Sequence, residues 1–243
     1  SSSSAASDVY KRQALYIYLL KIILKRRGII MGYRIITGKY ETGTEEQQKN
    51  FCELFGEEDI QFKFDLYFHW YNLVHELGHC LLEMYGKHME QVDEELYVNR
   101  FAVSYWKLAD GNENLVELKE MLTSIFYKLP NPVPQNMEPK EFFKSMWGNE
   151  KRPSVSLYGY FQFSCVLEAM SNESDLYEVL NEVGIKTTHL KEIKIYEGQV
   201  SSGSASDIIN LCIENLRNIG VAVADIKLEF ADNPEVQCAS IWS

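Results

Sequence analysis

The chain has 243 residues, of which 46% are hydrophobic and 13% aromatic, a composition that excludes an intrinsically disordered protein. The formal net charge is -11, and residues 1–30 carry six Lys or Arg and one acid, so residues 31–243 carry -16. Because binding to nucleic acid or to an anionic membrane depends on Lys and Arg, we expect neither as a partner.

The first thirty residues are expected to be a non-native leader. DVYKRQ at 8–13 resembles the translation of an adapter used in sequencing libraries, and KRRG at 25–28 could derive from a ribosome-binding site upstream of a start at Met31. The apolar stretch 14–24 is only about half the ~20 residues of a membrane-spanning helix. A signal peptide would place its positive charges before the apolar run, so the remaining alternative is a short amphipathic helix.

Two early segments are predicted to be strands, with a helix between them. YRIITGKY at 33–40 is rich in β-branched and aromatic residues, and DIQFKF at 59–64 alternates apolar with polar residues. The segment between them begins at Thr44, has acids in its first turn and ends before Gly56, which is typical of a capped helix.

The rest of the chain is predicted to be mainly helical. Apolar spacing and breaker residues predict helices at 66–85, 93–108, 115–129, 138–148, 154–171, 175–183 and 207–218. PNPVP at 130–134 predicts a rigid link, EGQVSSGSAS at 197–206 a linker, and VAVADIKLEF at 221–230 a strand. We therefore expect an α+β fold with a mainly helical body and a small β-sheet beside the helix at 66–85.

The strongest functional signal is HELGH at residues 75–79. Residues four apart on a helix are separated by one turn plus 40°, so His75 and His79 project from one face and can bind one Zn²⁺. Glu76 lies 100° around the helix and can act as the general base on a metal-bound water. Gly78 costs up to ~1 kcal/mol relative to Ala, which indicates a close neighbour such as a strand edge or the substrate. The alternative is a helix with two solvated or core-packed histidines.

A catalytic zinc site usually has three protein ligands, so a third is expected from elsewhere in the chain. The longer HExxHxxGxxH pattern is absent. Glu95 is favoured because Glu95 and Asn99 share a face of the next helix, where Glu95 can bind the metal while Asn99 holds the far nitrogen of a ligand histidine. Glu94 is expected to be solvated and is the second choice. The other nearby candidates are His88, Glu90 and Asp93.

YNLVHELGHCLL at 71–82, followed by EELYVNRFAVSYW at 94–106, resembles the ImmA/IrrE-type metallopeptidases of the gluzincin group. Those proteins carry HELGH on one helix and E-x-x-A-N/D-x-F-A on the next, so the family's Glu ligand falls on Glu95 and its Asn or Asp on Asn99. Val98 stands where the family usually has Ala, a modest change in packing volume. The resemblance covers about 66–108. We recognise no helix-turn-helix domain of the kind that family members often carry, so a repressor-cleaving role does not transfer.

The resemblance implies a cytoplasmic metallopeptidase that binds Zn²⁺ and hydrolyses a specific intracellular protein. In these terms 31–196 is the zinc metallopeptidase-like domain, and 197–243 is a linker plus a helix–strand appendage that could belong to the same domain. The alternative function is a non-catalytic, zinc-stabilised protein-interaction module. Hydrolysis of a non-peptide amide by the same residues is a third possibility.

Several other residues have simpler interpretations. The five cysteines include no CxxC pair and are expected to be reduced, mostly buried thiols, with Cys80 in the core. His69 is six residues before His75 and is expected to pack or to be solvated on the opposite face. Three residues could donate to an oxyanion but are not assigned as sites: Tyr158, Tyr160 and His189.

Overall fold

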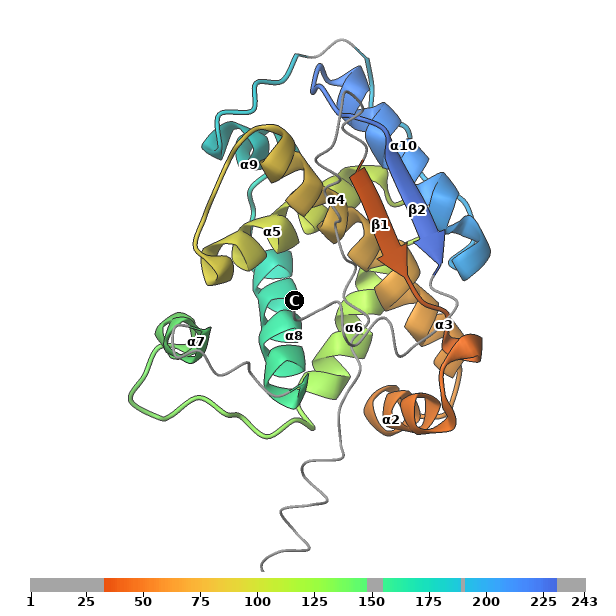
Figure 1. The fold of residues 1–243 in the computed structure, drawn as a ribbon, viewed down its shortest axis with the longest axis vertical. Coiled ribbons are helices and arrows are strands. Elements are labelled where there is room, and N and C mark those ends of the chain that lie inside the picture. Colours follow the sequence, from red (N-terminus) through yellow and green to blue (C-terminus); the bar gives the residue numbers. More distant parts are fainter. Residues whose placement is uncertain (1–32, 148–154, 189–190, 231–243) are drawn as a thin grey trace, which may run out of the picture.

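A computed structural model describes residues 33–147, 155–188 and 191–230. Helices predominate in the described residues, and two strands form one small sheet (Figure 1). The predicted α+β class with a mainly helical body is confirmed. The leader expected at 1–30 lies outside the described residues, as does the end of the C-terminal segment, 231–243.

The described elements follow one another with short connections. Their bounds are β1 Tyr33–Thr37, η1 Tyr40–Thr42, α2 Glu45–Phe55, α3 Ile60–Asp65, η2 Leu66–Tyr71, α4 Asn72–Met84, α5 Gln91–Ala109, α6 Asn114–Phe126, α7 Pro139–Trp147, α8 Val155–Ser171, α9 Leu176–Glu182, η3 Ser202–Ser204, α10 Ala205–Asn218 and β2 Ile226–Phe230. The HELGH motif lies on α4, and the predicted third ligand lies on α5.

The sheet joins the two ends of the described chain. β1 and β2 are parallel, with Tyr33 opposite Ile226 and Thr37 opposite Phe230 (Figure 1). Alternate residues of β1 are buried, as expected for a strand with one face on the core, and β1 contacts α4. Helix α10 contacts both α4 and β2. The segment that follows the predicted linker therefore packs directly on the helix that carries the motif.

The strand predicted at 59–64 is wrong, because this segment forms helix α3. Phe64 and Asp65 are buried, and α3 continues into η2 and α4 without an intervening loop. The backbone hydrogen bonds of the segment are therefore satisfied along the helix, whereas the sheet in the described residues consists of β1 and β2 alone. Six residues are too few for the alternation of apolar and polar residues to decide between a strand and a helix.

The helix predicted at 66–85 begins with a π-helical segment, η2, in which all six side chains are buried. Trp70 of η2 stacks on Trp106 of α5, with ring centroids 4.1 Å apart. His69 is packed in the core, where Nδ1 lies 2.6 Å from Asp65 Oδ1 and Nε2 donates to the carbonyl oxygen of Gly38 at 2.7 Å. His69 therefore holds the loop after β1 against the helix, and both of its ring nitrogens are occupied.

Gly78 lies where α4 approaches α5 most closely. A Cβ at this position would lie 3.0 Å from Phe101 Cδ1 and 3.2 Å from Val98 Cβ, both on α5. The predicted close neighbour of Gly78 exists, and it is a helix instead of a strand edge or a substrate. Val98, which stands where Ala is usual in the resembling family, fills part of the space that the missing side chain leaves.

The substitution Gly78→Ala is expected to lower the free energy of unfolding by about 1 kcal/mol. Ala would gain up to ~1 kcal/mol of helix propensity, but overpacking against two buried and stiff neighbours costs about 1–3 kcal/mol. Urea denaturation of the metal-free protein measures the difference. A stability equal to or above that of the parent chain would contradict the proposed close contact between α4 and α5.

Four of the five cysteines lie in the described residues, and none of these four forms a disulfide. Cys80, Cys165 and Cys212 are buried, while Cys52 is half-buried. The expectation of free, mostly buried thiols is confirmed for these residues, and Cys238 lies outside the described part of the chain. Burial raises the pKa of Cys80 and Cys212 well above the value of an exposed thiol.

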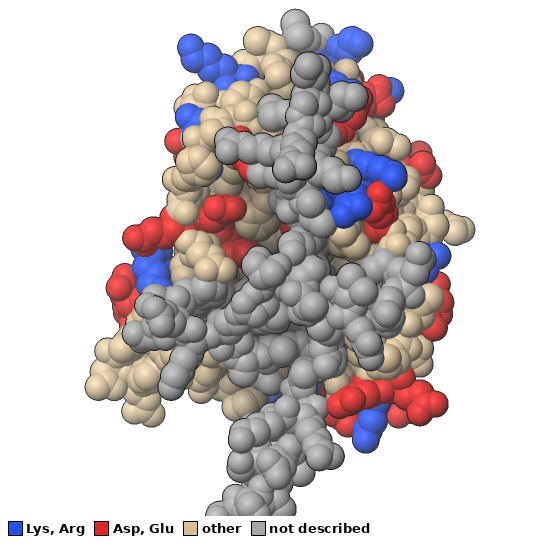
Figure 2. All heavy atoms as spheres, in the orientation of Figure 1, with Lys and Arg blue, Asp and Glu red and all other residues tan. Residues whose placement is uncertain are grey.

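Basic and acidic side chains are interspersed on the described surface. Figure 2 shows groups of both signs around the edge of one face. Lys140 and Lys144 pair with Asp93, and Lys194 pairs with Glu214. Across the described ranges, every helix falls short of the length and apolar character that crossing a membrane requires.

Candidate metal centre

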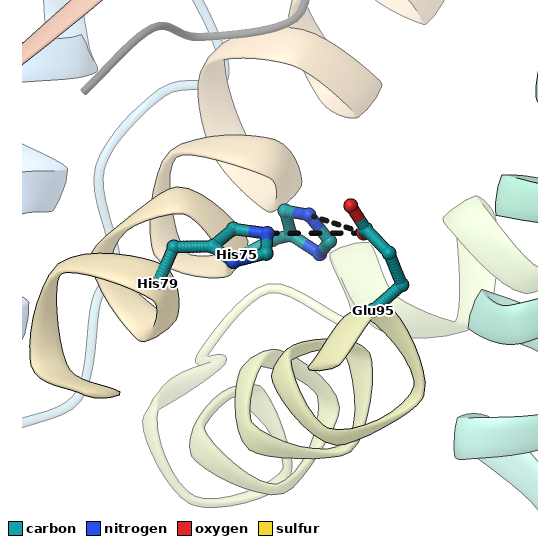
Figure 3. A group of neighbouring side chains, drawn as sticks. All are labelled: His75, His79 and Glu95. Carbon is teal, nitrogen blue, oxygen red and sulfur yellow. Dashed lines mark ion pairs between the residues drawn. The ribbon is translucent and has the colours of Figure 1, made fainter. Parts of the chain in front are cut away.

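Three metal-ligating side chains converge where α4 packs against α5. His75 and His79 project from the same face of α4, and Glu95 points toward them from α5 (Figure 3). His75 Nε2 lies 3.4 Å from Glu95 Oε2, and His79 Nε2 lies 3.8 Å from the same oxygen. The three ligand atoms all lie within 4.8 Å of one another. This group could hold one metal ion.

The spacing of these atoms fits a small tetrahedral ion. Ligands about 2.0–2.1 Å from a tetrahedral metal are separated by about 3.3–3.4 Å, close to the two distances measured from Glu95 Oε2. Among the described residues, His75 Nε2 is buried without a hydrogen-bond partner. A buried nitrogen without a partner costs free energy, and a bound cation would satisfy it. The chemistry of the donor set and its geometry therefore both fit a bound metal.

Asn99 determines which nitrogen of His75 is available to a metal. Its Oδ1 accepts from Tyr71 Oη at 2.8 Å and lies 3.2 Å from His75 Nδ1, while its Nδ2 donates to the carbonyl oxygen of Glu95 at 2.9 Å. Because Tyr71 donates and the carbonyl can only accept, the orientation of the Asn99 amide is defined. His75 Nδ1 must then carry the proton, which leaves the lone pair of Nε2 directed at Glu95 Oε2.

Glu94 holds the second histidine. Its Oε1 lies 2.7 Å from His79 Nδ1, and its side chain is 31% exposed. Burial lowers the pKa of His79, but the charge of Glu95 and the hydrogen bonds to Glu94 and Glu95 outweigh burial and raise the pKa well above its usual value. Glu94 therefore lies outside the three-ligand group and orients the imidazole from behind, where the sequence had indicated a solvated residue or a replacement ligand.

Glu95 is buried and remains ionised. Burial raises the pKa of its carboxyl group, but the charges and hydrogen bonds of His79 and His75 outweigh burial and lower that pKa below its usual range. Gln162 of α8 donates to Glu95 Oε2 at 2.8 Å. A buried carboxylate that faces two imidazoles attracts positive charge, which a proton on His79 or a metal ion can supply.

Glu76 is the buried carboxyl group next to the ligand set. Burial raises its pKa to about 7, although the charges of His75 and His79 lower it and only Glu95 adds to the rise among its charged neighbours. Asn72 Nδ2 lies 3.5 Å from Glu76 Oε1, at the limit of a hydrogen bond. A carboxyl group with a pKa near neutrality can accept a proton and return it at physiological pH.

The other residues considered from the sequence lie elsewhere or outside the described part. Glu90 and Asp93 pair with Lys144. Tyr160 stacks on Phe126, with ring centroids 4.6 Å apart. His189 lies outside the described residues, as does the side chain of Tyr158.

Sequence reasoning missed three residues that support the ligands, and they left unequal signals. Gln162 was detectable in principle, since it is an amide within the apolar run YGYFQFSCVL of α8. Glu94 is an acid next to a candidate ligand, and its position alone could not distinguish a solvated residue from a partner of His79. Tyr71 left no signal, because one more aromatic residue in YFHWY is typical of a core helix.

No known protein family, curated protein or solved structure matches the chain. The similarity of residues 66–108 to ImmA/IrrE-type metallopeptidases therefore rests on the motif residues alone. Any function has to be argued from the geometry of the site.

Proposed function

We propose that this protein is a zinc-dependent metallopeptidase that hydrolyses peptide bonds of a specific protein substrate, with Glu76 as the general base. The observation that carries the proposal is the convergence of His75 Nε2, His79 Nε2 and Glu95 Oε2 beside the buried Glu76 carboxyl group. Zinc is the proposed metal because two imidazole nitrogens and one carboxylate oxygen form a frequent catalytic zinc site.

The residues of the site divide the work of hydrolysis between them. His75, His79 and Glu95 would hold the metal, while Asn99 and Glu94 keep the two imidazoles in the required orientation. Zinc, when bound, supplies a Lewis acid that polarises the scissile carbonyl and makes a water molecule more acidic. Glu76 accepts the proton of the attacking water and transfers it to the leaving amine. Its elevated pKa supports both transfers.

The number of ligands supports a catalytic site over a structural one. Structural zinc sites normally have four protein ligands, whereas catalytic sites have three and an open position. The ligand group found among the described residues has three members. This difference favours hydrolysis over the alternative of a zinc-stabilised interaction module. The choice of a peptide over another amide rests on the resemblance of residues 66–108.

The proposed location is the cytoplasm, and the proposed partner is a protein or peptide substrate. The four described cysteines are free, which supports a reducing compartment. The acidic body of the chain supports a partner other than nucleic acid or an anionic membrane.

The proposal is tested on the purified full chain by elemental mass spectrometry and by incubation with a peptide library read by mass spectrometry. We expect about one zinc per chain, and cleavage that is lost after treatment with 1,10-phenanthroline and restored by added Zn²⁺. A magnesium supplement serves as the control for nonspecific recovery. A chain without zinc, or cleavage that survives removal of the metal, would overturn the proposal.

A further inference from the structure

Gln162 is an amide in an otherwise apolar stretch of α8, and its side chain contacts the metal-ligating carboxylate. The residue is 3% exposed, and its neighbours Phe161 and Phe163 are buried as well. Its Nε2 donates to Glu95 Oε2 at 2.8 Å, the same oxygen that faces both histidines. Helix α8 therefore reaches the ligand group through one side chain that lies in the interior.

The orientation of the Gln162 amide follows from the groups around it. Its Oε1 accepts from Asn99 Nδ2 at 3.4 Å, and Nε2 is directed at Glu95 Oε2. Asn99 in turn is oriented by Tyr71 Oη and by the carbonyl oxygen of Glu95. Tyr71 and Gln162 are thus connected through Asn99. The same network that sets the tautomer of His75 also sets the position of the carboxylate oxygen.

Burial of an amide in an apolar layer needs a compensating gain. Moving an amide out of water without hydrogen bonds costs about 2–7 kcal/mol, whereas Leu or Met would fill this space without that cost. The hydrogen bond to Glu95 Oε2 is charge-assisted and therefore stronger than a bond between neutral groups. The feature that requires an amide at this position is the carboxylate.

We infer that Gln162 is a positioning residue of the metal centre, which holds Glu95 Oε2 at the point where it meets the two histidines. The inference rests on the metal-binding part of the proposed function. The Glu95 side chain has three rotatable bonds, so a carboxylate without this donor would lose freedom when it binds the metal. With the donor in place, the oxygen is oriented before the metal arrives.

The test replaces Gln162 with Met, which has a similar shape but no donor, and compares it with Val166→Ala. Val166 is buried on the same helix one turn further along, so its truncation lowers stability without touching Glu95. Zinc affinity is measured on the full chain by competition with a chromophoric chelator. The visible spectrum of the Co²⁺-substituted protein reports ligand geometry, and urea denaturation of the metal-free proteins reports stability.

We expect Gln162→Met to bind zinc about 10–100-fold more weakly than the parent chain and to alter the Co²⁺ spectrum. Val166→Ala is expected to retain the affinity and spectrum of the parent. Gln162→Leu should repeat the result of Gln162→Met, and it replaces that variant if Met does not give a folded protein. Parent-like affinity in both Gln162 variants, or an equal loss in Val166→Ala, would overturn this inference alone. A parent chain that binds no zinc would overturn the proposed function with it.

Discussion

Replacing Glu76 with Gln is expected to leave zinc binding intact and to lower kcat/KM for peptide hydrolysis by about 10²–10⁴-fold. Glutamine preserves the shape of the side chain but cannot accept the proton of the attacking water, and general base catalysis contributes about this factor. Zinc should remain because Glu76 lies outside the group of three converging ligand atoms. The measurement combines zinc content by elemental mass spectrometry with initial rates on a peptide identified from the library.

The matched control for this variant is Glu83→Gln on the same helix. Glu83 is half-buried and is not one of the three converging ligands, so both zinc content and rate should stay at the level of the parent chain. Full activity in Glu76→Gln would exclude Glu76 as the base. Loss of zinc from Glu76→Gln would instead indicate that Glu76 is a ligand, and the proposed division of roles within the motif would be wrong.

Replacing Glu95 with Gln is expected to weaken zinc binding by more than about 100-fold, whereas Glu94→Gln should weaken it by about 10–100-fold. Glu95 Oε2 is the atom that both ligand nitrogens face, so its replacement removes a ligand. Glu94 acts on the metal through His79 Nδ1, and partners of that kind usually contribute one to two orders of magnitude. Competition with a chromophoric chelator measures both dissociation constants on one scale.

The order of the two effects distinguishes the two acids. Glu120→Gln on α6 removes one exposed carboxylate and should leave zinc affinity unchanged, which controls for the loss of charge. A larger loss in Glu94→Gln than in Glu95→Gln would make Glu94 the third ligand. Equal and small losses in both would mean that the metal is held by other residues.

The sequence by itself determined the parts of the site that depend on one helix. The HELGH spacing places His75 and His79 on one face of α4, because residues four apart on any helix are one turn apart. The same rule placed Glu95 and Asn99 together on α5. Helix α2 was equally local, since Thr44 and Gln47 form the capping box that starts it. In each case the determining contacts lie within four residues.

Local patterns were insufficient where a segment is short or its neighbours come from elsewhere in the chain. The segment 59–64 alternates apolar with polar residues but joins a continuous helical run, so its environment decided its structure. The neighbour of Gly78 was expected from helix propensity, but its identity depended on how α4 and α5 pack. Propensity measures the cost of a residue and contains no information about which element occupies the space.

Only the tertiary structure decided which residues support the ligands. Tyr71 lies 28 residues from Asn99, and Gln162 lies 67 residues from Glu95, yet both form hydrogen bonds inside the site. Contacts across such distances depend on the angles at which η2, α5 and α8 pack, and these angles are set by the whole core. The ligands could therefore be predicted from spacing along the helices, whereas the network that orients them arises only when the helices meet.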